Sequence, residues 1–163
     1  MLLHLDNAEV SMRLVYQLAE DLKTDQERVA MTQALTLDSS RPEMGLNGTY
    51  GLFASPQWWN SISDGSMPLT RVSGVIQRVF IAGQDAEPED IAFELQTEDG
   101  SRRVESCYVN DRDDMRFFQV NHRVDIVYAM DELKCRTNPG GKLNVSEIVL
   151  EMAVSETPAK KAA

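Results

Sequence analysis

The sequence has little cysteine, no long apolar run and no opening stretch of the kind that directs secretion. Cys107 and Cys135 are its two cysteines, too few for a disulfide framework. No segment approaches the ~20 apolar residues that a membrane-spanning helix needs. The chain turns acidic at Asp6, too soon for a signal peptide. We therefore expect a cytoplasmic protein with no membrane partner.

Basic residues are also scarce. The 163 residues include 16 Lys and Arg against 26 Asp and Glu, a net charge of −10. Such a charge repels polyanions and weighs against sequence-independent binding to nucleic acid, which needs Lys and Arg to neutralise phosphates. Apolar residues make up 42% of the chain and charged residues 26%, which is the balance of a globular protein with a core.

The residues that usually carry catalysis or bind metals are few and scattered. His4 and His122 lie far apart, with no Cys or Asp at metal-ligand spacing. Cys107 falls within a predicted strand, where it acts as a small hydrophobic residue. Cys135 lies between the basic residues Lys134 and Arg136, but no neighbour in sequence can serve as its general base. We therefore predict no enzymatic activity, no metal and no cofactor.

The first 37 residues are predicted to form a helical arm. Val10, Leu14, Leu18 and Leu22 recur every four positions, which indicates a helix over residues 8–23. A capping box, Thr24-Asp25-Gln26-Glu27, then starts a second helix over residues 25–36. The apolar residues of this second helix are small or spread widely around it: Val29, Ala30, Met31, Ala34 and Leu35.

Residues 38–69 are predicted to be an irregular connector that holds one short helix. Ser55 and Pro56 have the positions of an N-cap and a first helical residue, so the helix covers residues 56–62. It carries Trp58 and Trp59, whose side chains leave a helix about 100° apart. One tryptophan can therefore anchor the segment in a core while the other contacts a partner, and both are candidate partner-binding residues.

From residue 70 onward the pattern changes to the period-two alternation of strands. Five segments separated by turns are predicted to be extended, with a short helix over residues 111–118 between the third and the fourth. The five segments are residues 71–82, 91–97, 102–109, 123–131 and 143–154. A loop over residues 134–142 lies between the last two. The remaining residues, 155–163, are expected to be a disordered tail.

This order of strands and helix resembles that of the OB-fold, a five-stranded, partly open Greek-key barrel, over about residues 70–154. Gly74 suits the bend that such a first strand needs. The predicted fold class is therefore α+β, a helical arm followed by an OB-like barrel. An SH3-like barrel and an unclosed sandwich stay open as alternatives. Residues 1–69 have no counterpart in the OB-fold.

The resemblance implies ligand binding by the loops after the first and fourth strands of the barrel. The first loop, residues 83–90, holds four acids and no base, so it would repel phosphate. The second carries Lys134, Arg136 and Lys142 and is the candidate basic binding site. The sheet lacks the aromatic run on which single-stranded bases stack.

These observations favour a non-enzymatic protein-binding or assembly module of bacterial type. One alternative is an acidic antagonist or mimic that acts on a nucleic-acid-binding partner. Another is an oligonucleotide-binding domain that uses the loop after the fourth strand. The first helix has the stripe that contains Val10, Leu14 and Leu18, and Tyr16 on a different side, so its apolar surface covers more of the circumference than one small barrel can bury. These four residues are the candidates for self-association. The excess apolar surface predicts a homodimer, with an arm folded back on its own barrel as the alternative.

Overall fold

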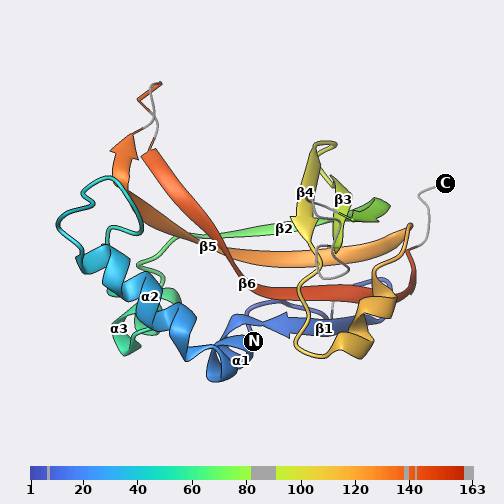
Figure 1. Ribbon diagram of the computed structural model, residues 1–163. Coiled ribbons are helices and arrows are strands. Elements are labelled where there is room, and N and C mark those ends of the chain that lie inside the picture. Colours follow the sequence, from blue (N-terminus) through green and yellow to red (C-terminus); the bar gives the residue numbers. More distant parts are fainter. Residues whose placement is uncertain (7, 82–90, 138–139, 142, 160–163) are drawn as a thin grey trace. The chain divides into compact units, whose positions relative to one another are not determined.

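A computed structural model gives the fold and describes residues 1–6, 8–81, 91–137, 140–141 and 143–159. Its strands form one antiparallel sheet in the order β1-β6-β5-β2-β3-β4 (Figure 1). The elements in chain order are β1 (Met12–Gln17), α1 (Leu18–Asp21), the 3-10 helix η1 (Leu22–Thr24), α2 (Gln26–Leu37), α3 (Pro56–Ser63), β2 (Leu69–Ile81), β3 (Ile91–Thr97), β4 (Arg102–Ser106), the 3-10 helix η2 (Arg112–Phe117), β5 (His122–Thr137) and β6 (Leu143–Pro158).

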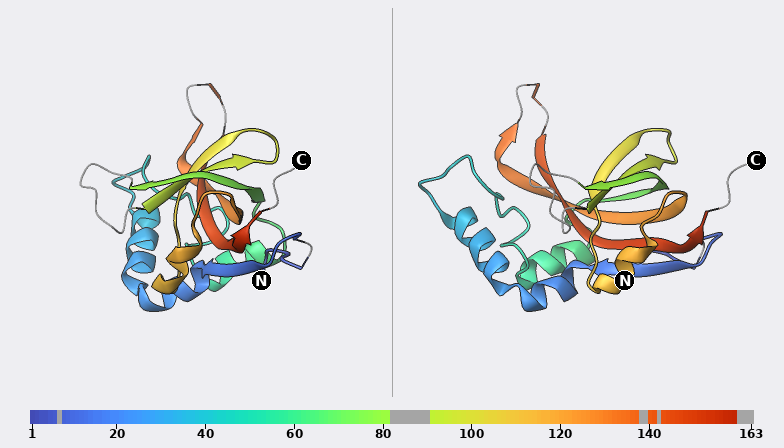
Figure 2. Two further views of the ribbon diagram at one scale, coloured as in Figure 1. Left: turned by 90° about the vertical axis from the view of Figure 1, so that its right-hand side faces the viewer. Right: turned by 45° about the vertical axis from the view of Figure 1, so that its right-hand side comes forward.

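The α+β class is confirmed, but the predicted first helix is wrong. Residues 12–17 form the strand β1, which pairs with β6 (Figure 2), and only the four residues of α1 follow as helix. The register with β6 shifts between Leu14 and Tyr16, so Val15 is an extra residue. The shift buries Val15 and Tyr16 consecutively, which removes the alternation that would have marked a strand.

Several predicted strands are confirmed within a few residues, and others differ. β3 has the predicted bounds, whereas β4 ends at Ser106. The segments 123–131 and 134–137 belong to one continuous strand, β5. β6 runs to Pro158, so the disordered tail predicted from residue 155 starts too early. Ser155 is fully buried. The sheet has six strands instead of five because β1 adds to it.

Gly74 serves a purpose other than the predicted bend. Its backbone approaches β3 so closely that a Cβ atom would lie 2.3 Å from the carbonyl oxygen of Gln96. The register shift of β2 occurs three residues later, between Ile76 and Arg78. Across the described residues the sheet is open, with β1 and β4 at its edges. The resemblance to the partly open barrel of the OB-fold stays a prediction.

The chain divides into two units, each made of separate stretches. Unit 1 contains Met1–Leu18, Arg71–Val127 and Leu150–Ala163, and unit 2 contains Ala19–Thr70 and Tyr128–Val149. The predicted division into residues 1–37, 38–69 and 70–154 concerns independent folding and stays a prediction. No helix in the described ranges has the length and apolar character needed to cross a bilayer.

Unit 1 has an apolar core from its strands and uses buried polar groups to fix its edges. Phe93 stacks on Phe118, with ring centroids 5.5 Å apart. The carboxylate of Glu151, which is 5% exposed, accepts hydrogen bonds from the amides of Leu2 and Leu3 at 2.8 and 3.0 Å. The first residues of the chain are thereby tied to strand β6.

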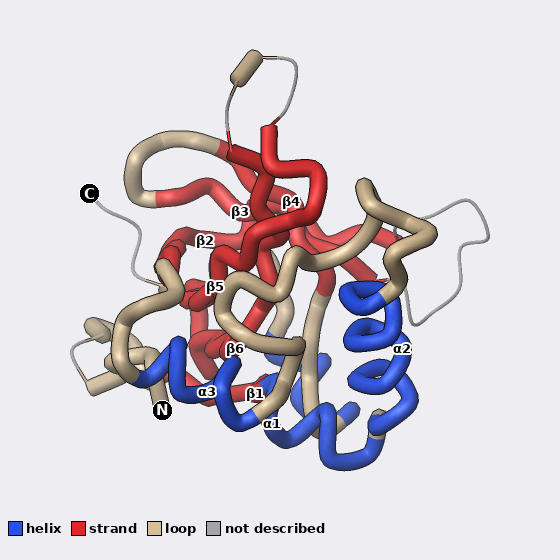
Figure 3. The backbone as a smooth tube through the Cα atoms, turned by 90° about the vertical axis from the view of Figure 1, so that its left-hand side faces the viewer, coloured by secondary structure: helices blue, strands red, loops and turns tan. Residues whose placement is uncertain are grey.

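Unit 2 combines helices α2 and α3 with the loop between them, residues 38–55 (Figure 3). Its core is centred on α3, where Trp58 and Ile62 are buried. Ser55 caps this helix because its hydroxyl accepts a hydrogen bond from the Trp58 amide at 3.2 Å, and Pro56 follows as predicted. Helix α2 is also confirmed, and none of its residues is buried.

Candidate functional site

Trp58 is a core residue. Its side chain is 0% exposed and packs edge-on against Phe53 and Trp59, with ring centroids 5.1 and 4.9 Å apart. The indole N–H donates a hydrogen bond of 2.9 Å to Oδ2 of Asp131, which is also buried. Trp58 therefore cannot touch a partner, and its prediction as a contact residue is wrong. The sequence already offered burial as the alternative.

Trp59 is half-buried and keeps an accessible face. It lines a hollow of about 170 Å³ together with Leu22, Val29 and Ala54. Tyr50 lies in the same unit, and burial raises the pKa of its phenol above the ordinary value, with the charges of Glu132 and Asp131 adding to the effect. Trp59 stays a candidate contact residue.

Lys134 has a structural role that accounts for its charge. Its ammonium group donates hydrogen bonds to the backbone carbonyls of Leu35, Asp38 and Arg41 at 2.6, 3.2 and 3.1 Å. It thereby neutralises the carbonyl-rich C-terminal end of α2. Arg136 lies in β5, with its side chain outside the described part, and Lys142 lies wholly outside it.

The residues predicted for self-association do not form a helical stripe. Tyr16 and Leu18 are 3% and 0% exposed, in or directly after strand β1. Val10 and Leu14 are half-buried, and Leu14 pairs with Ala153 of β6. The excess apolar surface that predicted a dimer is therefore used within unit 1. A homodimer stays a prediction, without the helix that motivated it.

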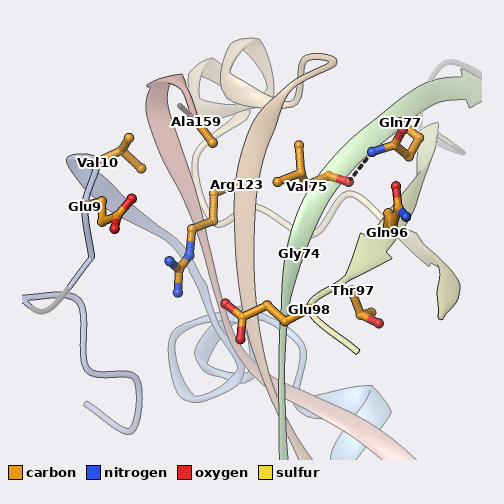
Figure 4. Close-up of a pocket in the computed structure, with 10 residues that line it drawn as sticks. All are labelled: Glu9, Val10, Gly74, Val75, Gln77, Gln96, Thr97, Glu98, Arg123 and Ala159. Carbon is orange, nitrogen blue, oxygen red and sulfur yellow. Dashed lines mark hydrogen bonds between the residues drawn. The ribbon is translucent and has the colours of Figure 1, made fainter. Parts of the chain in front are cut away.

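Unit 1 contains a cleft of about 290 Å³ (Figure 4). In the figure the guanidinium of Arg123 points into the space between Glu9 and Glu98. The same guanidinium is held by Asp125, with nitrogen–oxygen distances of 2.9 and 3.4 Å. The remaining lining is made of short apolar and amide or hydroxyl side chains: Val10, Val75, Gln77, Gln96, Thr97 and Ala159.

The electrostatics of this cleft are dominated by carboxylates. The hydrogen bond to Asp125 raises the pKa of Arg123 above its ordinary value, and the nearby charges of Glu98 and Glu9 add to that effect, while burial opposes it. Asp125 already compensates Arg123, so Glu9 and Glu98 leave the cleft with a negative surplus. Nothing in this arrangement resembles a nucleophile beside a base.

Helix α2 presents apolar side chains to solvent. Met31 is 65% exposed and Leu37 is 70% exposed, and Ala30 and Ala34 are exposed on the same side. Met44, in the loop after the helix, is 52% exposed. The sequence analysis missed these residues, although the wide spread of apolar positions in residues 25–36 was their signal.

A second apolar feature lies next to this helix. A hollow of about 370 Å³ is lined mainly by Met31, Leu35, Leu46 and Leu133. Within unit 2 it adjoins the exposed side of α2, because Met31 contributes to both. Large apolar side chains that face solvent beside an apolar hollow are typical of protein-binding surfaces.

The cysteines and histidines form no reactive constellation in the described part of the chain. Burial raises the pKa of the Cys107 thiol to about 12, so it is not a thiolate at neutral pH. Cys135 is exposed. Nδ1 of His122 is 2.7 Å from the carbonyl oxygen of Ser155. No set of three or more metal-ligating side chains gathers at one point among the described residues.

Comparison with known proteins adds one result to this geometry. The model of a family described as immunity protein RhsI2 matches residues 12–155 of the chain. The match begins at the first residue of β1 and ends within β6, so it takes in residues of both units. No curated protein matches the sequence.

Proposed function

Because the chain belongs to the RhsI2 immunity protein family, we propose that it binds a protein toxin of the Rhs class and neutralises it. The family match over residues 12–155 carries this proposal. It covers 144 of the 163 residues.

An immunity protein acts by binding, so the chain is not an enzyme, as the sequence predicted. The activity of a binding protein lies in its surface, which must match the partner in shape and charge. The described surface offers an apolar helix face in unit 2 and a carboxylate-rich cleft in unit 1. The apolar face suits a protein partner with exposed apolar side chains, and the cleft suits one that carries positive charge.

The alternative in which the partner is itself a nucleic-acid-binding protein fits within this proposal. A toxin that acts on nucleic acid presents a basic surface to it, and a net charge of −10 attracts such a surface. Direct oligonucleotide binding has less support, because Lys134 of the candidate loop is engaged with three backbone carbonyls.

Coexpression tests the proposal directly. Cells that express an Rhs toxin from the same genome should stop growing, and coexpression of this chain should restore growth. The purified chain should also form a stable complex with the purified toxin in solution. An unrelated acidic immunity protein, which should do neither, is the control. Continued growth arrest with no complex would contradict the proposal.

A cytoplasmic location follows from the same proposal if the toxin acts there.

A further inference from the structure

Helix α2 turns a row of apolar residues to solvent, although Val29 and Leu35 of the same helix are half-buried. Ala30, Met31, Ala34 and Leu37 follow the helical period and are all exposed, with Glu27 at the start of the same side. A surface helix normally turns such residues toward the core and its polar residues toward water. Burial of an exposed Met or Leu side chain stabilises a protein by about 1.5–3 kcal/mol, so folding alone favours the opposite orientation.

The rotation of α2 is fixed by polar contacts on its inner side. Nε2 of Gln33 donates a hydrogen bond of 2.8 Å to the carbonyl oxygen of Phe53. Thr32 and Thr36 face the same inner side, and their hydroxyls donate within the helix to carbonyls of the preceding turn, at 2.7 and 3.2 Å, so they need no partner outside it. Lys134 holds the C-terminal end. The outward position of Met31 is therefore part of the fold.

The adjoining hollow is equally well defined. Gly45 packs against Leu35 so closely that a Cβ atom would lie 2.8 Å from Cγ of that leucine. Its φ angle of +89° also favours glycine. The amide of Lys134 donates to the Gly45 carbonyl at 3.0 Å, and Leu46 bridges to Leu133 in β5. A side chain that entered the hollow would meet fixed walls.

Charges around this surface leave carboxylates available. Three cations that the structure describes in this part of unit 2 are already engaged: Arg28 lies 3.7 Å from Asp21, Arg41 lies 3.7 Å from Asp38, and Lys134 binds carbonyls. Glu27 and Glu43 are exposed, and within the described residues neither makes an ion pair. The rim of the apolar surface is therefore negative.

We propose that this surface, the outward side of α2 with Met44 and the adjoining hollow, is where the toxin docks. The inference rests on the proposed function. The toxin segment that fits it carries one or more apolar side chains for the hollow, flanked by Lys or Arg opposite Glu27 and Glu43. Apolar anchors provide most of the binding energy at such interfaces, and the charged rim favours fast association with a basic partner.

The double variant Met31→Glu, Leu37→Glu tests this proposal with the purified Rhs toxin, by calorimetric measurement of Kd. Loss of two apolar anchors, with added charge facing an apolar partner, should weaken binding at least about 100-fold. The matched control is Val104→Glu, since Val104 is 56% exposed in β4 of unit 1. The control should change Kd less than about threefold.

A second measurement does not depend on variants. Hydrogen exchange of the wild-type chain should slow in residues 26–46 when the toxin is bound, and stay unchanged in β4. The charge variant Glu27→Lys, Glu43→Lys should weaken binding about tenfold and flatten its salt dependence.

The outcomes separate the two proposals. Wild-type chain that does not bind the toxin overturns the proposed function. If the wild-type chain binds the toxin, two results together overturn only the docking surface. These are a folded double variant that binds as tightly as wild type, and no slowing of hydrogen exchange over residues 26–46. A homodimer that dissociates in the double variant while toxin affinity is unchanged also overturns it, because the surface then serves a second copy of the chain.

Discussion

Helices α3 and α2 of unit 2 use their apolar residues in opposite ways. α3 buries Trp58 and Ile62 and leaves Gln57 and Asn60 to solvent. α2 buries none of its residues and exposes Met31 and Leu37. α3 is thus a stabilising element of the core, whereas α2 presents large apolar side chains that are mostly exposed to solvent. The difference indicates which helix serves the partner.

The two helices should therefore respond differently to substitution. In α3, loss of apolar side chains should lower the free energy of unfolding and impair binding only through the loss of folded protein. In α2, the same kind of change should leave stability intact and alter binding. Four predictions test that contrast, beginning with the largest expected change in stability.

Trp58→Ala should destabilise the chain by about 3–5 kcal/mol, because it removes a fully buried aromatic side chain. It also deprives Asp131 of its indole donor. Urea denaturation monitored by circular dichroism measures the change. Gln57→Ala, in the same helix but exposed, is the control and should stay within about 0.5 kcal/mol of wild type. Equal effects of the two variants would mean that α3 does not anchor the core.

Asp131 should make stability depend on pH. Burial raises the pKa of its carboxyl above the ordinary value of 3.8, although the hydrogen bond from Trp58 opposes the rise. Its Oδ1 atom is buried with no hydrogen-bond partner among the described residues. The folded state therefore holds the proton more tightly than the unfolded state. Stability should fall as pH rises from about 3.8 through the folded-state pKa.

Two variants at this position separate charge from hydrogen bonding. Asp131→Ala should cost about 1–3 kcal/mol at neutral pH, because it leaves the buried Trp58 N–H unpaired. Asp131→Asn keeps an acceptor for that N–H and removes the ionisation, so it should be more stable than Asp131→Ala. The stability of Asp131→Asn should also no longer fall as the pH rises. Thermal unfolding measured from pH 4 upward would show this. An unchanged pH profile in Asp131→Asn would assign the dependence to another group.

Lys134→Met should lower stability by about 1–2 kcal/mol, because the carbonyls of Leu35 in α2, of its C-cap Asp38 and of Arg41 in the following loop lose their charged donor. Hydrogen exchange should quicken in the last turn of α2 and in residues 38–41 more than in α3. Lys23→Met is a suitable control, since Lys23 is exposed and its ammonium pairs with the exposed side chain of Glu20. A uniform change over both helices would contradict a local role for Lys134.

Sequence reasoning located the elements whose patterns are local. α3 begins at the predicted cap, Ser55-Pro56, and β3 has the predicted alternation and bounds. It failed at β1, where the bulge at Val15 hides the strand period and four apolar residues happen to have helical spacing. The same residues could form a helix or a bulged edge strand, and the choice depends on pairing with β6. The β6 residues that pair with β1 lie more than 130 residues later in the chain.

The candidate site was harder to predict than the fold. Trp58 and Trp59 were predicted as contact residues because tryptophan is frequent at interface hot spots, and Lys134 because it lies in the basic loop that the OB-fold resemblance marks for binding. Trp58 and Lys134 each have a partner within the chain instead. The sequence shows how apolar residues are spaced in α2, but not which way the helix is rotated. That rotation depends on Gln33 and on the Phe53 carbonyl twenty residues away.

The smallest effect on stability is expected from the double variant Met31→Gln, Leu37→Gln. Both side chains are more than half exposed, and glutamine is about as good a helix former as methionine or leucine. The free energy of unfolding should therefore stay within about 0.5 kcal/mol of wild type, while protection from the toxin in coexpressing cells is lost. Ile62→Gln in α3, where the isoleucine is 6% exposed, is the matched opposite and should unfold much of the protein. A loss of stability in the α2 variant similar to that of Ile62→Gln would show that Met31 and Leu37 pack within the fold after all, and would end the distinction between a helix that stabilises and a helix that binds.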